Sequence, residues 1–312
     1  MKKVLLHIHL DGSVRPDTVS ELLNLDIDYV KSNMIAKNCS SLSDYLTKFD
    51  LPIKAMQTKD NLTRIAFELA TDLKNDDVIY AEVRFAPFFH IKNGLTYDDV
   101  IISILEGFNR CSGIKINLLL CMMRGLSYED NKDIIYLAKK YLGKGVVGID
   151  LAGDEYKYKT SLYEDLFRLA NFNNIPFTIH AGEADGASSI RDAIKYGAKR
   201  IGHGIRCVSD INLMELIKDK NILLEVCPSS NVQTGVVVDY VFHKAKFLFD
   251  NGIKICINTD NQTVSNVTVN EEYNRLKKYL EFSDEDLKKC NKYAIEGSFI
   301  TKEEKEELIK EL

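Results

Sequence analysis

Four short polar clusters each follow an apolar run of this chain, and they hold most of the residues that could do chemistry. They are His7-Ile8-His9 with Asp11, His180-Ala181-Gly182-Glu183, Gly202-His203-Gly204 and Asn258-Thr259-Asp260-Asn261. The apolar runs are short and β-branched and precede helix-like stretches, so the polar residues fall where a strand ends and a loop begins. In a parallel α/β fold, binding and catalytic side chains gather at that place. Imidazole and carboxylate groups there indicate a metal-dependent hydrolase.

His7 and His9 are the first candidates for metal ligands. Residues two apart on a strand point to the same face, so this spacing offers two imidazoles to one ion. An isolated His-x-His pair is also compatible with packing. His180 and the Asp260 carboxylate would complete a set suited to zinc, with iron, cobalt or manganese as alternatives. A metal ion with an open position lowers the pKa of its bound water toward about 7, which supplies a nucleophile for hydrolysis.

Glu183 and His203 are the candidates for proton transfer. Glu183 follows His180 by three residues, so it can face the same cavity and pass a proton to or from a substrate. A solvated loop carboxylate is the alternative. His203 lies between two glycines, and it could be a further metal ligand, a general base or a histidine satisfied in the core. His90 and His243 have no such context, and we expect both to be structural.

Eight apolar runs predict the strands that carry these clusters: residues 3–9, 78–85, 116–123, 146–151, 177–180, 200–203, 222–226 and 253–257. Several segments between them have apolar residues three and four apart and predict helices, at 189–196, 211–218 and 240–250. Strands that alternate with helices indicate a parallel sheet, and continuous apolar runs indicate strands covered on both faces. Eight such strands favour an α/β fold of the TIM type, a (β/α)8 barrel, over a doubly wound sheet.

A helical insert and a helical C-terminus complete the predicted organisation. The insert covers residues 43–73, after the first strand, and residues 283–312 are rich in lysine and glutamate. Asp11-Gly12-Ser13 contains neither of the glycine-rich phosphate loops, which argues against a nucleotide-binding doubly wound sheet. Because the chain has no repeat, proline-rich linker or low-complexity segment, we expect residues 1–312 to form a single domain.

Composition and charge exclude several classes of protein. The fractions of 45% hydrophobic and 28% charged residues are ordinary for a globular protein. A net charge of −5 without a long basic run argues against nucleic acid and membrane partners and favours a small molecule. The apolar start is interrupted by His7 before it could form a signal peptide, and no later run approaches the roughly 20 residues of a membrane span. Seven scattered cysteines without a C-x-x-C pair indicate reduced thiols in a cytoplasmic protein and argue against cysteine ligands.

In combination, these motifs resemble the adenosine deaminase family of the amidohydrolase superfamily over essentially the whole chain. Residues 1–16 resemble the family's first strand and its H-x-H-L-D-G-S signature, and residues 149–155 resemble its D-L-A-G-D-E segment. The sequences His-Ala-Gly-Glu at 180–183, Arg-Ile-Gly-His-Gly at 200–204 and Asn-Thr-Asp at 258–260 resemble its later motifs.

The resemblance implies one zinc ion per subunit, held by His7, His9, His180 and Asp260. It also implies that His203 orients and deprotonates the attacking water and that Glu183 protonates purine N1. Hydroxide then adds at C6, ammonia leaves and inosine forms. Asp260 is thus expected among the catalytic residues as well as the ligands, and His9 also among the substrate contacts.

The resemblance further implies contacts to a purine nucleoside. The backbone N–H of Gly153 would bind N3, and Asp11 would accept a hydrogen bond from the ribose 5′-hydroxyl. Many family members have a second aspartate where this chain has Asn261. Because an asparagine amide always carries donors, we expect Asn261 to contact N7, which is an acceptor. Relatives that act on free adenine tend to have glutamate at the position of Asp11, so the aspartate favours a nucleoside.

Two further groups of residues match the family. Tyr45, Leu46 and Phe49 resemble a hydrophobic lid near the ribose, with packing against the barrel as the alternative. Glu82 and Arg84 resemble an E-V-R strand, and we expect them to form a buried structural pair.

Three hypotheses about function result. The first is deamination of adenosine and 2′-deoxyadenosine to inosine and deoxyinosine, a reaction of purine salvage. The second is deamination of adenine or another 6-aminopurine. The third is a purine-binding or metal-binding barrel without activity, against which the presence of both Glu183 and His203 argues. The sequence leaves the oligomeric state open.

Overall fold

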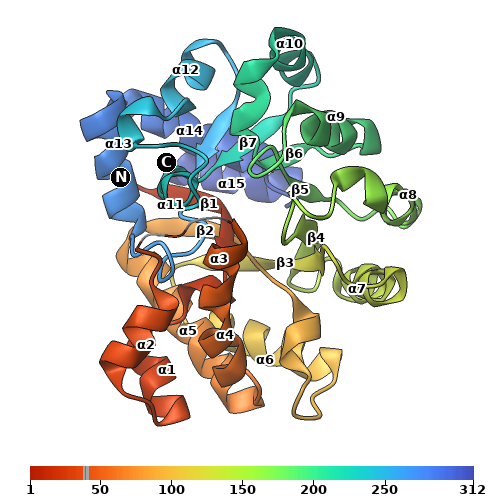
Figure 1. Cartoon of the computed structure of the whole chain (residues 1–312), viewed down its shortest axis with the longest axis vertical. Helices are drawn as coiled ribbons and strands as arrows, with labels where there is room; N and C mark the ends of the chain where they lie inside the picture. The colour runs from red at the N-terminus through yellow and green to blue at the C-terminus, as the bar shows by residue number, and fades with distance from the viewer. Residues whose placement is uncertain (38, 40–41) are drawn as a thin grey trace.

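The computed structural model describes residues 1–37, 39 and 42–312, and in them eight parallel strands alternate with helices (Figure 1). The strands form two runs of neighbours, β1-β2-β3-β4 and β5-β6-β7-β8. Single backbone bridges join the runs at both edges, Ile149 to Phe177 and Ile8 to Asp260. The strands are β1 Lys3–His9, β2 Val78–Phe85, β3 Lys115–Met123, β4 Val146–Ala152, β5 Thr178–Ala181, β6 Arg200–His203, β7 Leu223–Val226 and β8 Ile255–Ile257. The predicted eight-stranded α/β fold is confirmed.

The strands are buried on both faces, as their continuous apolar runs predict. Leu5 and Leu6 point to opposite faces of β1, and each is 0% exposed. Leu5 belongs to the large core that includes the surrounding helices. Leu6 packs in a smaller core with Leu308 and Ile295, which come from the C-terminal helices. The two cores together keep the parallel strands away from solvent.

The helices of the described residues lie between and after the strands. They are α1 Pro16–Leu23, α2 Ile27–Met34, α3 Leu42–Leu46, α4 Asp50–Ala55, α5 Lys59–Asn75, α6 Tyr97–Asn109, α7 Tyr128–Tyr141, α8 Glu164–Phe172, α9 Ala187–Tyr196, α10 Ile211–Asp219, α11 Pro228–Gln233, α12 Ala245–Asp250, α13 Val269–Leu280, α14 Asp284–Gly297 and α15 Lys302–Glu311. The predicted insert is confirmed as α3, α4 and α5, with a 3-10 turn at Thr47–Phe49. The predicted helical C-terminus is α14 and α15, each of which begins with a capping box.

The single helix predicted for residues 240–250 is wrong. A 3-10 turn covers Tyr240–Phe242, and α12 begins only at Ala245. His243 between them has an extended backbone, with φ −67° and ψ 137°. Its ring nitrogen Nδ1 accepts a hydrogen bond from the N–H of Ala245. This side-chain acceptor takes the place of a helical carbonyl, so the apolar spacing alone could not reveal the break.

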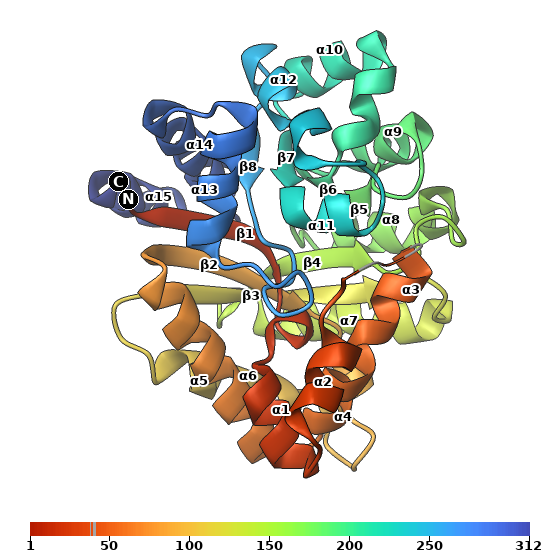
Figure 2. The same ribbon diagram turned by 60° about the vertical axis from the view of Figure 1, so that its left-hand side comes forward.

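The two ends of the strands have different surroundings. The N and C termini lie close together in both views, with α15 beside them (Figure 2). Helix α3 of the insert lies toward the opposite end, where the strands end and the polar clusters begin. None of the helices in the described ranges is both long and apolar enough to cross a membrane.

Candidate active site

A cavity of about 790 Å³ opens at the carboxyl ends of the strands and is large enough for a nucleoside. Its wall combines residues from strand ends with residues from the insert. The strand ends contribute His9, Asp11, Ala86, Cys121, Met123, Ala152, Gly153, His180, Glu183, His203, Asp260 and Asn261. The insert contributes Leu42, Tyr45, Leu46, Phe49, Asp50, Ile53, Lys54 and Gln57. The two halves of the cavity therefore come from the barrel and from the segment predicted to cover it.

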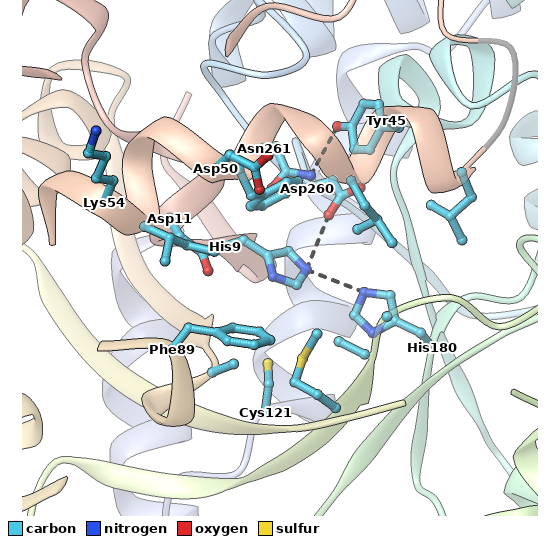
Figure 3. A pocket seen from close by; sticks show the side chains of 18 of the residues that line it. His9, Asp11, Tyr45, Asp50, Lys54, Phe89, Cys121, His180, Asp260 and Asn261 are labelled. Carbon is cyan, nitrogen blue, oxygen red and sulfur yellow. Dashed lines mark hydrogen bonds and ion pairs between the residues drawn. The ribbon is translucent and has the colours of Figure 1, made fainter. Parts of the chain in front are cut away.

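Three of the four predicted metal ligands, His9, His180 and Asp260, line this cavity (Figure 3), and His7 lies close beside them. His7 Nε2 lies 3.3 Å from Asp260 Oδ1, and His9 Nε2 lies 3.4 Å from the same oxygen. His180 Nε2 lies 3.3 Å from His9 Nε2. One ligand atom from each of the four residues lies within 4.8 Å of all the others.

The donor set fits a divalent ion. Although His7 Nε2 is close to Asp260, it has no hydrogen bond of acceptable geometry among the described residues, and its ring is 0% exposed. A buried ring nitrogen without a partner is costly unless an ion or proton occupies the space in front of it. Three imidazoles and one carboxylate form a set typical of zinc. The geometry therefore brings the four predicted ligands together from the ends of three strands, β1, β5 and β8.

Buried carboxylates orient two of these imidazoles from behind. His7 Nδ1 lies 3.0 Å from Glu225 Oε2, and His180 Nδ1 lies 2.9 Å from Asp150 Oδ2. A carboxylate at Nδ1 holds the ring proton there and leaves the Nε2 lone pair facing the metal. Burial alone would raise the pKa of both carboxyl groups, but His180 and Arg84 lower that of Asp150, and the Arg84 and Arg200 guanidinium groups lower that of Glu225. Both groups are therefore anions.

Glu82 and Arg84 are both buried, at 0% exposed, as predicted. The prediction that they pair with each other is wrong, because each pairs with residues of other strands. Arg84 lies between the orienting carboxylates, 2.9 Å from Asp150 and 2.8 Å from Glu225. Glu82 instead accepts from Arg200 at 2.6 Å. Because Glu82 and Arg84 lie on one strand, the sequence could not show which strands across the barrel would supply their partners. Arg84 thus links the two carboxylates that orient His7 and His180.

Glu183 is a buried acid beside the cluster, not a solvated loop residue. It is 4% exposed, and its Oε2 lies 3.6 Å from His203 Nε2. Burial, and then the charge of Asp260, raises the pKa of Glu183 well above its usual value. A carboxyl group that keeps its proton near neutral pH can donate that proton to a substrate nitrogen.

Glu155, which the sequence marks only as part of the D-L-A-G-D-E segment, holds the loop that carries Glu183. This side chain is 1% exposed. Its carboxylate accepts hydrogen bonds from the backbone N–H groups of Gly182, Glu183, Ala184 and Asp185, at 2.7, 3.0, 2.8 and 3.1 Å. Ser189 Oγ donates to it as well, at 2.6 Å. The loop after β5 is therefore wrapped around one carboxylate, which fixes the backbone from which the Glu183 side chain extends.

The backbone is unusual at two residues of the cluster. His203 has φ 62° and Asp260 has φ 60°, both in the left-handed region that side chains rarely adopt. Gly204, with φ 68°, continues this left-handed turn after His203. A Cβ atom at Gly202 would lie 3.0 Å from the His7 ring, and one at Gly204 would lie 2.7 Å from Leu224. Close packing therefore requires glycine at both Gly202 and Gly204, and the bend requires it at Gly204.

Asp11 and Asn261 lie together at the wall of the cavity. Asp11 is 6% exposed, and burial raises its pKa to about 7. Asn261 Nδ2 donates to the Tyr45 hydroxyl at 3.0 Å. Gly12, which follows Asp11, packs against Asn261 and has no room for a side chain, because a Cβ atom there would lie 1.8 Å from Asn261 Oδ1.

The predicted lid residues and Gly153 also reach the cavity. Tyr45, Leu46 and Phe49 all line it, and the Phe49 and His9 rings lie 6.4 Å apart between centroids. Tyr45 also forms a hydrogen bond with Ser265, and the two hydroxyl oxygens lie 3.0 Å apart. Gly153 also lines the cavity, and its φ is 101°.

The two histidines predicted to be structural have different surroundings. His90 is buried away from the cavity wall and contacts the carbonyl of Met56. His243 contacts Asn231, which in turn contacts His203. Asn231 follows the end of β7, so the general rule that function gathers at strand ends could have singled it out.

Cys227 lies nearer to the cluster than expected. Its thiol is within 4.8 Å of ring nitrogens of His7 and His203. Burial raises the pKa of this thiol well above its usual value, and Sγ lies 3.6 Å from the Glu225 carbonyl oxygen. A thiol that stays protonated is a poor metal ligand.

Comparison with known proteins identifies the family of this chain. The sequence model of the family described as adenosine deaminase matches residues 2–312. The chain belongs to the adenosine deaminase family. It is 42% identical over 325 residues to the adenosine deaminase of Clostridium acetobutylicum, covering 100% of this chain and 97% of that protein. It is 41% identical over 326 residues to the adenosine deaminase of Clostridium botulinum, covering 99% and 98%. The protein is therefore a hydrolase of the adenosine deaminase type.

Solved structures share the whole fold. The adenine deaminase of Arthrobacter aurescens has a TM-score of 0.89 at 24% identity, covering 99% of this chain and 97% of that one. The N6-mAMP deaminase of Arabidopsis has a TM-score of 0.89 at 26% identity, covering 99% and 96%. An amidohydrolase of Burkholderia ambifaria, solved with bound Zn, has a TM-score of 0.87 at 23% identity, covering 98% and 88%. The barrel is common to proteins named for different purine substrates.

Proposed function

We propose that this protein is a zinc-dependent adenosine deaminase that converts adenosine and 2′-deoxyadenosine to inosine and deoxyinosine with release of ammonia. One observation carries the proposal: a buried acid with a raised pKa, Glu183, faces His203 beside a cluster of three imidazoles and a carboxylate. That combination supplies a proton donor and a place for an attacking water within one cavity. The relatives at about 42% identity that bear the name adenosine deaminase support the same reaction.

The proposed metal ligands are His7, His9, His180 and Asp260. A bound zinc ion supplies Lewis-acid chemistry, which makes water a nucleophile at neutral pH. Glu225 and Asp150 hold the ring protons of His7 and His180 on Nδ1, so that both imidazoles present their Nε2 lone pairs.

Glu183 is the proposed acid at purine N1. Donation of a proton to N1 withdraws electron density from C6, which is the carbon that the water attacks. The raised pKa suits this role, because an ionised carboxylate has no proton to donate. The bond from C6 to the amino nitrogen then breaks, and the nitrogen leaves as ammonia.

His203 and Asp260 are the proposed partners of the attacking water. Ligand atoms of Glu183, His203 and Asp260 lie within 4.8 Å of one another, so that one water molecule placed among them contacts all three. His203 and Asp260 both have a left-handed backbone, which turns the two residues from their strand ends toward this space.

Substrate recognition is assigned to residues around the same cavity. We propose that the N–H of Gly153 binds N3, that Asp11 accepts from the 5′-hydroxyl and that His9 packs against the base. Asn261 would contact N7 with the second N–H of its amide, since the first donates to Tyr45. Tyr45, Leu46 and Phe49 would cover the ribose and exclude water.

A panel of purines tests the proposal. Structural neighbours are named for adenine and N6-mAMP, and two lysines, Lys54 and Lys92, line the cavity and would favour a 5′-phosphate by their charge. Adenosine, 2′-deoxyadenosine, adenine, AMP and N6-methyl-AMP should be compared by ultraviolet absorbance, with a chelator-treated sample as control. We expect metal-dependent conversion of the two nucleosides. Conversion of adenine alone, or of a nucleotide alone, would replace the proposed substrate while keeping the reaction.

A further inference from the structure

We propose that Asn231 and His243 are positioning residues that hold His203 in one tautomer, with its proton on Nε2 facing the cavity. The three residues form a continuous chain of hydrogen bonds that ends at a backbone amide. Its kinetic consequence rests on the proposed deaminase function, but the tautomer itself can be measured without turnover.

The direction of the chain is set at its outer end. The N–H of Ala245 donates to His243 Nδ1 at 3.0 Å. A backbone amide cannot reverse its role, so Nδ1 carries no proton. In a neutral imidazole the proton must then lie on Nε2. Burial lowers the pKa of His243 to about 4, which keeps the ring neutral near pH 7.

The same direction passes through Asn231 to His203. His243 Nε2 lies 3.2 Å from Asn231 Oδ1, and the N–H donates to this oxygen. Asn231 therefore turns its amide nitrogen, Nδ2, toward His203 Nδ1, 3.0 Å away. An amide nitrogen only donates, so His203 Nδ1 must be the acceptor. The reverse orientation of the amide would place two N–H groups against each other at His243.

The remaining proton of neutral His203 thus lies on Nε2. This atom is buried and has no hydrogen bond within the described part of the chain, and Glu183 Oε2 is 3.6 Å away. His203 therefore presents a donor to the oxygen that attacks the purine. Of the two tasks expected for His203 from the family resemblance, the chain of hydrogen bonds supports orientation of the water. A neutral ring that already carries a proton on Nε2 cannot accept another there, so removal of the water proton falls to a carboxylate of the site.

Local structure is arranged around this chain. Asn231 is 0% exposed and His243 is 4% exposed, so water does not compete for their hydrogen bonds. The break between Tyr240–Phe242 and α12 places the His243 ring where Ala245 can donate to it. A continuous helix over these residues would have used that N–H for a backbone bond. The interruption of the helix is therefore what makes the anchor available.

Nuclear magnetic resonance of the ring nitrogens tests the tautomer directly. The chain has 6 histidines, so a protein labelled with 15N-histidine gives a spectrum that single substitutions can assign. A ring nitrogen that carries a proton resonates far from one that does not. We expect an unprotonated Nδ1 and a protonated Nε2 for His203 in the zinc-loaded wild-type protein. A protonated Nδ1 with a bare Nε2 would overturn the proposal whatever the enzyme's activity.

Three variants separate polarity from packing. His243→Gln keeps an acceptor for Ala245 and a donor for Asn231, so the tautomer of His203 and kcat should stay near wild type. His243→Phe keeps the ring and removes both groups, so His203 should populate both tautomers. Asn231→Asp offers only acceptors and should move the His203 proton to Nδ1.

The kinetic result should follow the spectra. For His243→Phe we expect kcat to fall about 10- to 100-fold, the range seen when a residue behind an active-site group is lost, with KM and zinc content unchanged. His90→Phe is the matched control, since His90 is an equally buried histidine outside this chain, and it should keep both kcat and the tautomer. Wild-type kcat and tautomer in His243→Phe would overturn the proposal. So would a folded His243→Gln protein as impaired as His243→Phe, because packing of the ring would then explain the loss.

Discussion

Glu155→Gln tests whether the loop after β5 is positioned by one carboxylate. The substitution keeps the shape of the side chain but replaces one oxygen with an amide nitrogen that cannot accept. In the wild-type protein, Oε1 accepts from Gly182 N and Ser189 Oγ, and Oε2 accepts from the N–H groups of residues 183–185. Whichever way the amide turns, at least one buried backbone N–H faces another donor.

The expected loss of stability follows from these contacts. One buried N–H without an acceptor costs about 1 to 3 kcal/mol. The remaining bonds lose a charged acceptor, which makes each weaker by roughly 1 kcal/mol. Because Ser189 can rotate its hydroxyl to accept, it offsets part of the loss. We expect the free energy of unfolding of Glu155→Gln to fall by about 2 to 5 kcal/mol.

The activity of Glu155→Gln should fall more than its stability requires. Glu155 holds the loop that carries the Glu183 side chain. A displacement of that side chain by about 1 Å would lower kcat/KM by on the order of 100-fold. Denaturant unfolding and adenosine turnover should be measured well below the melting temperature, so that the folded fraction is complete. Asp165→Asn is the control: it removes the same charge from a side chain that is 79% exposed, and it should change neither quantity.

Wild-type stability together with wild-type kcat/KM in Glu155→Gln would refute the reasoning. Lower stability with unchanged kcat/KM would show that Glu155 supports the fold without placing Glu183.

Three further predictions follow from other buried groups. Glu183→Gln should bind zinc as the wild type does but lower kcat by about 100- to 10,000-fold, because an amide cannot cycle a proton; kinetics and metal analysis of the same sample check this. Asp11→Ala should raise the KM for adenosine about 10- to 100-fold with little change in kcat, and an unchanged KM would remove Asp11 from the ribose site. Burial raises the pKa of Glu272 from its usual 4.5 to about 7, so the folded protein keeps a proton that the unfolded chain loses between these values, and stability falls as pH rises through that window. Glu272→Gln should therefore be more stable than wild type above pH 7 by about 3 kcal/mol, with the difference vanishing below pH 4.5, as denaturant unfolding at several pH values would show.

Much of the fold could be predicted from the sequence because burial on both faces leaves a strong signal. In strand β1, for example, residues 4–6 form an apolar run before His7, and the strand is buried almost throughout. The cluster of candidate ligands could be predicted for a related reason. His7 and His9 share a strand face, and His180 and Asp260 follow strand ends that a barrel brings together.

The residues behind the ligands could not be predicted in the same way. Arg84 pairs with Asp150 and Glu225, which lie 66 and 141 positions away in the sequence. Their contact depends on how strands face one another across the interior, and apolar periodicity carries no information about that. The sequence therefore suggested Glu82, a near neighbour of Arg84 on the same strand, as its partner.

His243 shows a second reason for error. Its segment has the apolar spacing of a helix, yet the side chain of His243 itself accepts the N–H that would continue one. Side-chain hydrogen bonds that replace backbone bonds are invisible to a pattern of apolar residues. The same bond links His243 to His203 through Asn231, so the local failure of the helix prediction coincides with a contact to the active site.

Titration of the metal-free protein with zinc tests the central claim most directly. Adenosine deamination and bound metal should be followed together, for wild type and for His180→Ala. If the four ligands hold one catalytic ion, wild-type activity should rise in proportion to added zinc and stop rising at one equivalent, while His180→Ala should gain little activity and bind zinc weakly. Full activity without metal, or a plateau unrelated to the bound zinc, would contradict the account.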